Sequence, residues 1–295
     1  MDRALKIAIC SFAISIVVLA IKCAAYLLTG SVALLSDALE SIINVVTALA
    51  VIISIRVAVR PPDAQHPYGH HKAEYLSAIV VGAMIIGAAL AIMNAAYQGF
   101  LHPKPIEAAW AGLAVSSAAT MLNVLWALYL IGQGRAQRSA SLAADGKHLM
   151  ADVVTTIGVL LGVVLVMFTG IEELDAGVAA LVALHVLWSG WGVVRESASS
   201  LLDEAAPPHE LALIKEVIVK NSVDAIETHD LRTRNAGKAT FIEFHLVVPT
   251  GMTVEDAHNI CDRLEDALKA SVSGAVTNIH VEPQTKAKGA LATAF

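Results

Sequence analysis

The sequence is poor in cysteine, in charged side chains and in aromatic side chains. Its three Cys among 295 residues are an odd number without regular spacing, which excludes a disulfide scaffold. Only 16% of the residues are charged and 5% are aromatic, whereas 56% are hydrophobic. The net charge of −6 comes without a basic stripe, so nucleic-acid binding is not expected. The apolar excess over an ordinary soluble protein indicates a membrane protein.

Long apolar runs fill the first two thirds of the chain. Each run is about 20 residues or longer, which is the length that a helix needs to cross a bilayer. Helices are expected because they satisfy their own backbone hydrogen bonds in lipid. The first run is too long for a signal peptide, so we interpret it as a retained span. We predict a transmembrane domain of six helices within residues 1–200, at 5–28, 32–58, 74–100, 108–132, 142–169 and 173–199.

Lys and Arg are distributed unequally among the connecting segments. The N-terminus, the loops after the second and fourth spans and the segment after the sixth span carry most of them, and the opposite loops are nearly bare. The positive-inside rule therefore predicts that both termini are cytoplasmic. We expect a multi-pass protein of a cell membrane, the bacterial inner membrane, with the lipid bilayer as its surroundings.

The last third of the chain reads as a soluble domain, in the order helix, strand, strand, helix, strand. Thr253 is the expected N-cap of the second helix, and an NAGK turn joins the first two strands. This order predicts a metallochaperone-like α+β domain (αββαβ) over residues 204–284, with two helices on a three-stranded sheet. Residues 285–295 are expected to be a disordered tail. The predicted elements are 207–222, 225–237, 238–249, 253–272 and 276–283.

Polar side chains share one face on each of two predicted spans. Asp37, Glu40 and Asn44 follow helical spacing in the second span, and His148 and Asp152 are four residues apart in the fifth. A charged group inside a bilayer costs on the order of 2.5–3.5 kcal/mol, so packing two polar faces together around a cation would stabilise both. The carboxylate, amide and imidazole donors suit a divalent first-row metal. Interhelical hydrogen bonding is the alternative, and Asp37 could instead cap the helix or line an exit path.

Two further groups of residues carry metal-binding side chains. In the loop after the second span, Asp63, His66 and His70 put one oxygen and two nitrogens within reach of one ion, although a loop His is as often only solvated. The predicted soluble domain is rich in His, and His280 shares a strand face with Glu282. A solvated strand face is the alternative for that pair. The candidate metal ligands of the domain are His229, His245, His258, His280 and Glu282.

Five stretches resemble the cation diffusion facilitator family: GSVALLSDALESIINVV, PPDAQHPYGHHKAEYLSA, ADGKHLMADVV, HDLRTRNAGKATFIEFHLVVP and NIHVEP. The similarity covers about residues 5–285. It implies a homodimer with six helices per subunit, a cytoplasmic metal-binding and dimerisation domain, and metal export driven by proton antiport.

The resemblance also implies roles for single residues. The transport site falls on Glu40, Asn44, His148 and Asp152, where Glu and Asn replace the usual Asp or His followed by Asp. Asn44 brings no charge, so the site has fewer carboxylates than in many relatives. The implied loop site consists of Asp63, His66 and His70. The implied cytoplasmic sites use His229, His245, His258, His280 and Glu282. The ion pair implied for the dimer joins Lys72 and Asp203.

We therefore expect a secondary transporter that exports divalent transition-metal cations from the cytoplasm in exchange for protons. Zn(II), Fe(II), Co(II) and Mn(II) fit the donors, and Zn(II) is the transported and regulatory ion that we expect first. No other cofactor and no enzyme activity are expected. A passive divalent-metal channel is one alternative. A membrane-embedded metalloenzyme is another, but the HExxH motif is missing.

Overall fold

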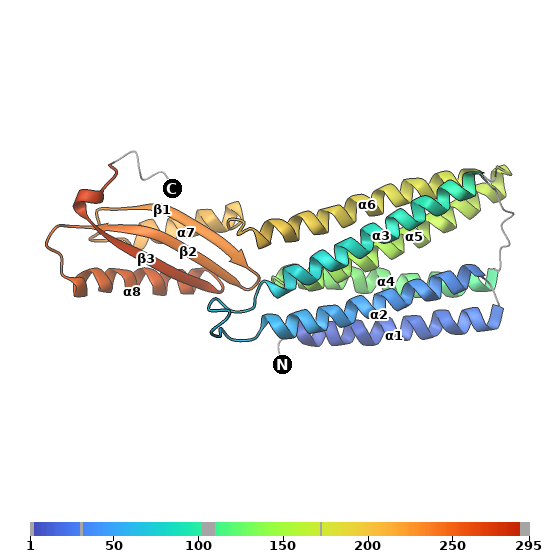
Figure 1. Cartoon of the computed structure of the whole chain (residues 1–295), viewed down its shortest axis with the longest axis horizontal. Helices are drawn as coiled ribbons and strands as arrows, with labels where there is room; N and C mark the ends of the chain where they lie inside the picture. Colours follow the sequence, from blue (N-terminus) through green and yellow to red (C-terminus); the bar gives the residue numbers. More distant parts are fainter. Residues whose placement is uncertain (1–2, 30–31, 102–109, 172, 290–295) are drawn as a thin grey trace. The chain divides into compact units, whose positions relative to one another are not determined.

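The chain folds as two compact units, residues 1–198 and 199–295 (Figure 1). Each unit has a hydrophobic core of its own, so the two are described separately. The structure is a computed structural model in which the described residues are 3–29, 32–101, 110–171 and 173–289.

The first unit consists of long helices, as the apolar runs predict. Each helix has 27 to 30 residues, which at 1.5 Å per residue gives about 40 Å or more and exceeds the hydrocarbon thickness of a bilayer. Within the described residues, α1, α3 and α6 hold stretches that are long and apolar enough to cross a membrane. The six helices are α1 (Arg3–Thr29), α2 (Val32–Ala58), α3 (Ala73–Leu101), α4 (Trp110–Ala136), α5 (Ala140–Thr169) and α6 (Glu173–Leu201).

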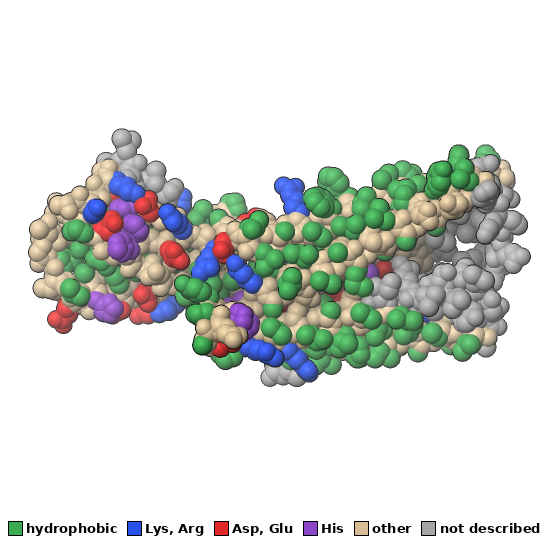
Figure 2. Space-filling view, in the orientation of Figure 1, with side chains coloured by type: hydrophobic (Ala, Val, Ile, Leu, Met, Phe, Trp, Pro, Cys, Tyr) green, Lys and Arg blue, Asp and Glu red, His purple; other side chains and the backbone are tan. Residues whose placement is uncertain are grey.

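Large apolar side chains cover the outside of the helical unit. Figure 2 shows hydrophobic side chains along its length on the face in view, and Trp188 and Leu181 are 78% and 68% exposed. Soluble proteins rarely expose contiguous apolar surface on this scale, so this outer surface suits lipid rather than water. The unit is therefore a transmembrane domain.

Helix α5 holds a central position in this unit, because it packs against α2, α3 and α4. Its residue Leu149 belongs to a core cluster with α1, α2 and α4, and Ala151 belongs to a second cluster with α3 and α6. At Gly146 a β-carbon would lie 2.8 Å from the Ile131 side chain of α4, so the two helices are in close contact there. Most residues of the stretch 145–153 of α5 are therefore buried against other helices.

The second unit is the predicted αββαβ domain. Its strands form one sheet in the order β1-β2-β3, with β1 antiparallel and β3 parallel to β2. The turn at Gly237 has a positive φ of 57°, which glycine adopts without strain. The elements are α7 (Pro208–Asn221), β1 (Glu227–Ala236), β2 (Ala239–Val248), α8 (Val254–Ser271), β3 (Ala275–Pro283) and the 3₁₀ helix η1 (Gln284–Lys286).

Both helices of this unit pack on one face of the sheet. Ile214 of α7 and Leu264 of α8 share a buried core with Phe244 of β2. Thr253 caps α8 as predicted, since its hydroxyl oxygen accepts a hydrogen bond of 3.1 Å from the Asp256 N–H. Side chains alternate along a strand, so the odd-numbered residues of β2 point to the opposite face of the sheet. That second face lies opposite α7 and α8 and carries His245.

The segment after β3 differs from the predicted disordered tail. It forms η1 and then lies against β1, where the N–H groups of Lys288 and Gly289 both donate to the Glu227 carboxylate, at 2.8 and 3.2 Å. Alternating hydrophobicity gives no signal for such a contact, because it is made by backbone amides. Residues 290–295 of the predicted tail lie outside the described residues.

Candidate metal centres

The polar faces of α2 and α5 meet inside the helical unit. The amide nitrogen Nδ2 of Asn44 donates a hydrogen bond of 2.5 Å to Oδ2 of Asp152. The two residues are 3% and 6% exposed. Burying polar groups away from water is costly unless they are bonded, so this contact couples the two helices at one point.

His148 lies one helical turn before Asp152 on the same face of α5, and it is 3% exposed. The Oδ1 atom of Asn44 is buried, and no hydrogen-bond partner is found for it within the described part of the chain. Asn44, His148 and Asp152 thus bring amide oxygen, imidazole nitrogen and carboxylate oxygen into one enclosed region. Glu40 belongs to α2 one turn before Asn44, but its side chain, like that of Asp37, lies outside the described residues.

Hydroxyl groups occupy the backbone acceptors beside this site. Thr47 donates to the Asn44 carbonyl at 2.9 Å, and Thr155 donates to the Asp152 carbonyl at 2.7 Å. The same α5 face carries a second buried carboxylate one turn before His148. Asp145 is 1% exposed and accepts a hydrogen bond of 2.8 Å from Ser11 of α1. The polar face of α5 therefore continues from the metal donors toward the helix N-terminus.

The predicted loop group forms a compact cluster. Donor atoms of Asp63, His66 and His70 lie within 4.8 Å of one another. Asp63 is 3.3 Å from His66 Nδ1 and 3.4 Å from His70 Nε2. The His66 N–H, which donates to the Asp63 carboxylate at 2.7 Å, helps to hold the pKa of that carboxyl below its usual range. Gly69 allows the turn, since its φ of +83° favours glycine.

A row of three histidines crosses the sheet of the second unit. His229 is the register partner of His245, and His245 is the register partner of His280. Their ring centroids are 5.2 and 4.9 Å apart along the row. Glu282, two residues beyond His280, shares their face because strand side chains alternate.

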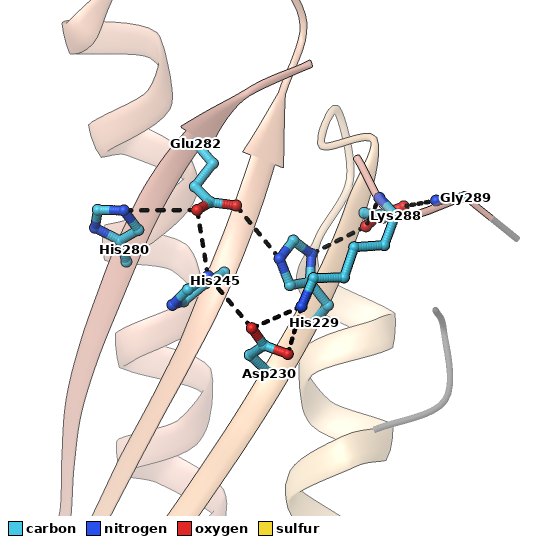
Figure 3. A network of polar contacts seen from close by, with 8 residues as sticks. His229, Asp230, His245, His280, Glu282, Lys288 and Gly289 are labelled. Atoms are coloured by element: carbon cyan, nitrogen blue, oxygen red, sulfur yellow. Dashed lines mark hydrogen bonds and ion pairs between the residues drawn. The ribbon is translucent and has the colours of Figure 1, made fainter. Parts of the chain in front are cut away.

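The Glu282 carboxylate lies among all three rings (Figure 3). Its oxygens are 3.3 Å from His229 Nε2, 3.4 Å from His245 Nδ1 and 3.7 Å from His280 Nε2. Three imidazoles around a carboxylate form a donor set that suits Zn(II) and its neighbours in the first transition row. Four of the five predicted ligands of this domain are therefore adjacent.

Two acidic residues of β1 that the sequence did not point to complete the cluster. Donor atoms of Asp230, His229 and His245 lie within 4.8 Å of one another, and Glu227 Oε1 is 2.9 Å from His229 Nδ1. Alternation would turn Asp230 away from His229. An irregular register between His229 and Arg232 and a φ of 53° at Asp230 bring it to the histidine face, as β-bulges do.

The acidic residues are themselves stabilised as anions by the segment after β3. Lys288, whose ammonium contacts Asp230, holds the pKa of that carboxyl below its usual range. The N–H groups of Lys288 and Gly289 likewise lower the pKa of Glu227. Both groups are therefore charged at neutral pH.

Three further predicted residues are not among the donor groups described above. His258 is exposed on α8, where its Nε2 is 3.6 Å from Asp262 on the same helix. Asp203 is 3.6 Å from Arg234 within the second unit, while Lys72 belongs to the first unit. The proposed pair of Lys72 with Asp203 joins the two units and stays a prediction.

A bundle of long apolar helices with a buried metal donor set, followed by an α+β domain with a histidine cluster, defines a membrane transporter of metal cations. Comparison with known families agrees with this class. Residues 8–202 match the cation efflux transmembrane domain, and residues 206–284 match the cytoplasmic domain of cation efflux proteins. The chain belongs to the cation efflux family.

Relatives with matching lengths carry consistent names. An uncharacterized transporter of Synechocystis, sll1263, is 40% identical over 94% of this chain and 89% of its own length. The cation-efflux pump FieF of Shewanella oneidensis is 32% identical over 92% of each chain, and that of Serratia proteamaculans is 31% identical over 94% and 91%. A solved structure of a candidate zinc transporter, CzrB, in its zinc form is 45% identical and covers 29% of this chain and 98% of its own, with a TM-score of 0.28.

Proposed function

We propose that this transporter exports divalent transition-metal cations from the cytoplasm through a site made of Asn44, His148 and Asp152, completed by Glu40. The observation that carries the proposal is the buried contact of Asn44 with Asp152, at 2.5 Å between α2 and α5. A protein that used its helices only as a membrane anchor would gain nothing from buried polar donors at the centre of the bundle.

The donor set favours Zn(II), with Fe(II), Co(II) and Mn(II) as further candidates. Imidazole suits first-row ions such as zinc and iron, whereas carboxylate and amide oxygens suit harder ions as well. The cation-efflux names of the relatives support a metal cation as the cargo. Asn44 is neutral, so it attracts a cation less strongly than a carboxylate would. His148 and Asp152 therefore contribute a larger share of the metal-binding free energy than they would beside a third charged ligand.

Exchange for protons follows from the chemistry of the same donors. His148 binds a metal only in its neutral form, so a proton and a metal ion compete for its lone pair. Alternating access to the two sides of the membrane would then convert this competition into antiport. An acidic exterior would favour release of the metal there, and a higher cytoplasmic pH would favour its capture.

We further propose that the chain acts as a homodimer with both termini in the cytoplasm. The match to the dimerising cytoplasmic domain family supports the dimer, and the distribution of Lys and Arg supports the orientation. In this arrangement the second unit senses cytoplasmic metal through His229, His245, His280 and Glu282. His258 lies on α8 and not in the row of histidines, so it would bind a metal at a separate site. The loop cluster of Asp63 would bind the same kind of ion.

Replacing Asp152 with Asn tests the transport site. D152N keeps the size of the side chain but removes the charge that binds the ion, so we expect the zinc flux into proteoliposomes to fall by at least tenfold, equivalent to about 1.4 kcal/mol of lost stabilisation. Asp266→Asn, on the exposed surface of α8, is the matched control because it also removes one carboxylate. Zinc flux in D152N equal to that in D266N would contradict the site assignment.

A further inference from the structure

The segment that follows β3 lies directly against the histidine cluster of the second unit. Lys288 places its ammonium 2.7 Å from both carboxylate oxygens of Asp230 (Figure 3). Its backbone N–H donates to Glu227, and so does the N–H of Gly289. The short helix η1 precedes these contacts and turns the chain back toward β1. We call residues 284–289 the C-terminal strap.

Asp230 can therefore contact two kinds of cation, a metal ion and the Lys288 ammonium. It lies with His229 and His245 in a group whose donor atoms are all within 4.8 Å, which is close enough for one metal ion. Both of its oxygens also contact the Lys288 ammonium. An ion bound among Asp230, His229 and His245 would lie next to the ammonium, and two positive charges at such a separation repel each other.

We propose that Lys288 is an internal counter-cation of this cluster, which holds Asp230 while no metal is bound and is displaced when a divalent ion binds. The strap would then weaken metal binding and would be released by it. This inference rests on the proposed binding of metal by the His229 and His245 cluster. It assigns to the strap a part in setting the metal concentration at which the second unit responds.

A supporting role for the strap would have the opposite effect. Glu227 accepts two strap amides and is 2.9 Å from His229 Nδ1, so the strap could orient His229 as outer ligands of a metal site do. In that case removing Lys288 would weaken metal binding. The two roles are distinguished by the sign of the change in affinity, not only by its size.

Zinc affinity of the full-length protein measures this sign. Purified protein carrying D152N, which silences the transport site, is titrated with zinc against a chelating dye. Breaking an exposed ion pair such as Lys288 with Asp230 changes an equilibrium constant by about two- to fivefold. We therefore expect Lys288→Gln to increase the zinc affinity by that factor. Lys286→Gln removes the same charge from the same strap and should change the affinity by less than half as much. An unchanged or weaker affinity in K288Q, or an equal gain in K286Q, would overturn the inference.

The same titration separates this inference from the proposed function of the cluster. Replacing His229 and His245 together with Ala should abolish the binding step that K288Q shifts. Persistence of that step would mean that zinc binds elsewhere, and the cluster itself would lose its assignment. If the step disappears but K288Q leaves it unshifted, the cluster keeps its assignment and only the role of Lys288 fails.

A readout independent of affinity is the reactivity of the two lysines. A low dose of an acylating reagent labels free amines, and mass spectrometry compares Lys288 with Lys286 within one protein. We expect zinc to raise labelling of Lys288 severalfold, toward the level seen in Asp230→Asn without metal, while Lys286 stays constant. Labelling of Lys288 that zinc lowers or leaves unchanged would overturn the release of the strap.

Discussion

At the scale of single residues, Asn44 is the feature that distinguishes the proposed transport site. Its amide donates to Asp152 through Nδ2, and its Oδ1 atom is the donor that a cation can use. An Asp at this position could not make the same hydrogen bond, since two carboxylates at that distance repel each other unless a proton or a metal lies between them. The neutral side chain therefore lets α2 and α5 stay in contact at this point without a bound ion.

Placing a carboxylate at position 44 should make the stability of the protein more dependent on bound metal. In Asn44→Asp we expect the metal-free form to lose stability and the zinc- or manganese-bound form to gain affinity, with the larger gain for Mn(II) because it is the harder ion. A tenfold gain would add roughly 1.4 kcal/mol and raise the metal-bound Tm by about 3 °C. Thermal unfolding in detergent with and without each metal measures both changes.

Asn123→Asp is the control for that experiment, because Asn123 is also a buried amide, 4% exposed, but lies on α4. It should destabilise the protein regardless of metal. Equal responses of N44D and N123D to Mn(II) would contradict the role of Asn44.

Residue spacing predicted some of these sites and not others. His148 and Asp152 follow from a fixed helical repeat, and Glu282 shares a face with His280 from a fixed strand repeat. Asp230 could not be predicted in this way, because a bulge changes the face on which it lies. The side chain of Glu40 is outside the described residues, so its part in the site stays a prediction.

At the scale of elements, α5 connects the two core clusters of the membrane domain. Gly146 allows its approach to α4, where an added β-carbon would be 2.9 Å from the Ile131 backbone nitrogen and 3.0 Å from the Ala127 carbonyl oxygen. Backbone atoms in a helix cannot rotate away as a side-chain end can. The position of His148, two residues further along, therefore depends on a glycine.

We predict that Gly146→Ala separates α4 from α5 and lowers both stability and transport. Overpacking of this kind costs about 1–3 kcal/mol, which outweighs the gain of up to about 1 kcal/mol that Ala gives in a helix. Gly132→Ala on α4 has open space around its β-carbon and should be neutral or stabilising. Tm and zinc flux of the two variants test this, and a G146A protein with the properties of G132A would contradict the close contact.

Helices and strands were predicted more completely than the contacts between them. Length and apolarity predict six long helices, and alternation with an NAGK turn predicts the αββαβ order; the structure has both. Within the described residues, three of these helices hold apolar stretches long enough to cross a membrane. The sequence predicted that the strap is disordered. The structure differs because the strap is held by a short helix, by backbone N–H groups and by one lysine side chain. Sequence periodicity carries no information about these contacts.

At the scale of the whole molecule, the two units are proposed to bind metal for different tasks. As proposed, the membrane unit moves the ion through the enclosed site of Asn44, His148 and Asp152 between α2 and α5. In the second unit, exposure rises along the row of histidines, from 3% for the His229 side chain to 34% for His245 and 68% for His280, so metal would reach the row from the His280 end. We propose that the first unit exchanges the ion for protons as it carries the ion across the membrane.

Lumen pH during zinc uptake tests that claim most directly. Proteoliposomes containing a trapped pH dye receive zinc from outside, and molecules with their cytoplasmic side outward carry it in. Antiport predicts that protons leave as zinc enters, so the lumen becomes more alkaline, and that an acidic lumen speeds uptake. Neither change should occur with D152N. Zinc uptake by the unaltered protein with a constant lumen pH and no dependence on the pH gradient would contradict proton antiport and indicate a passive channel.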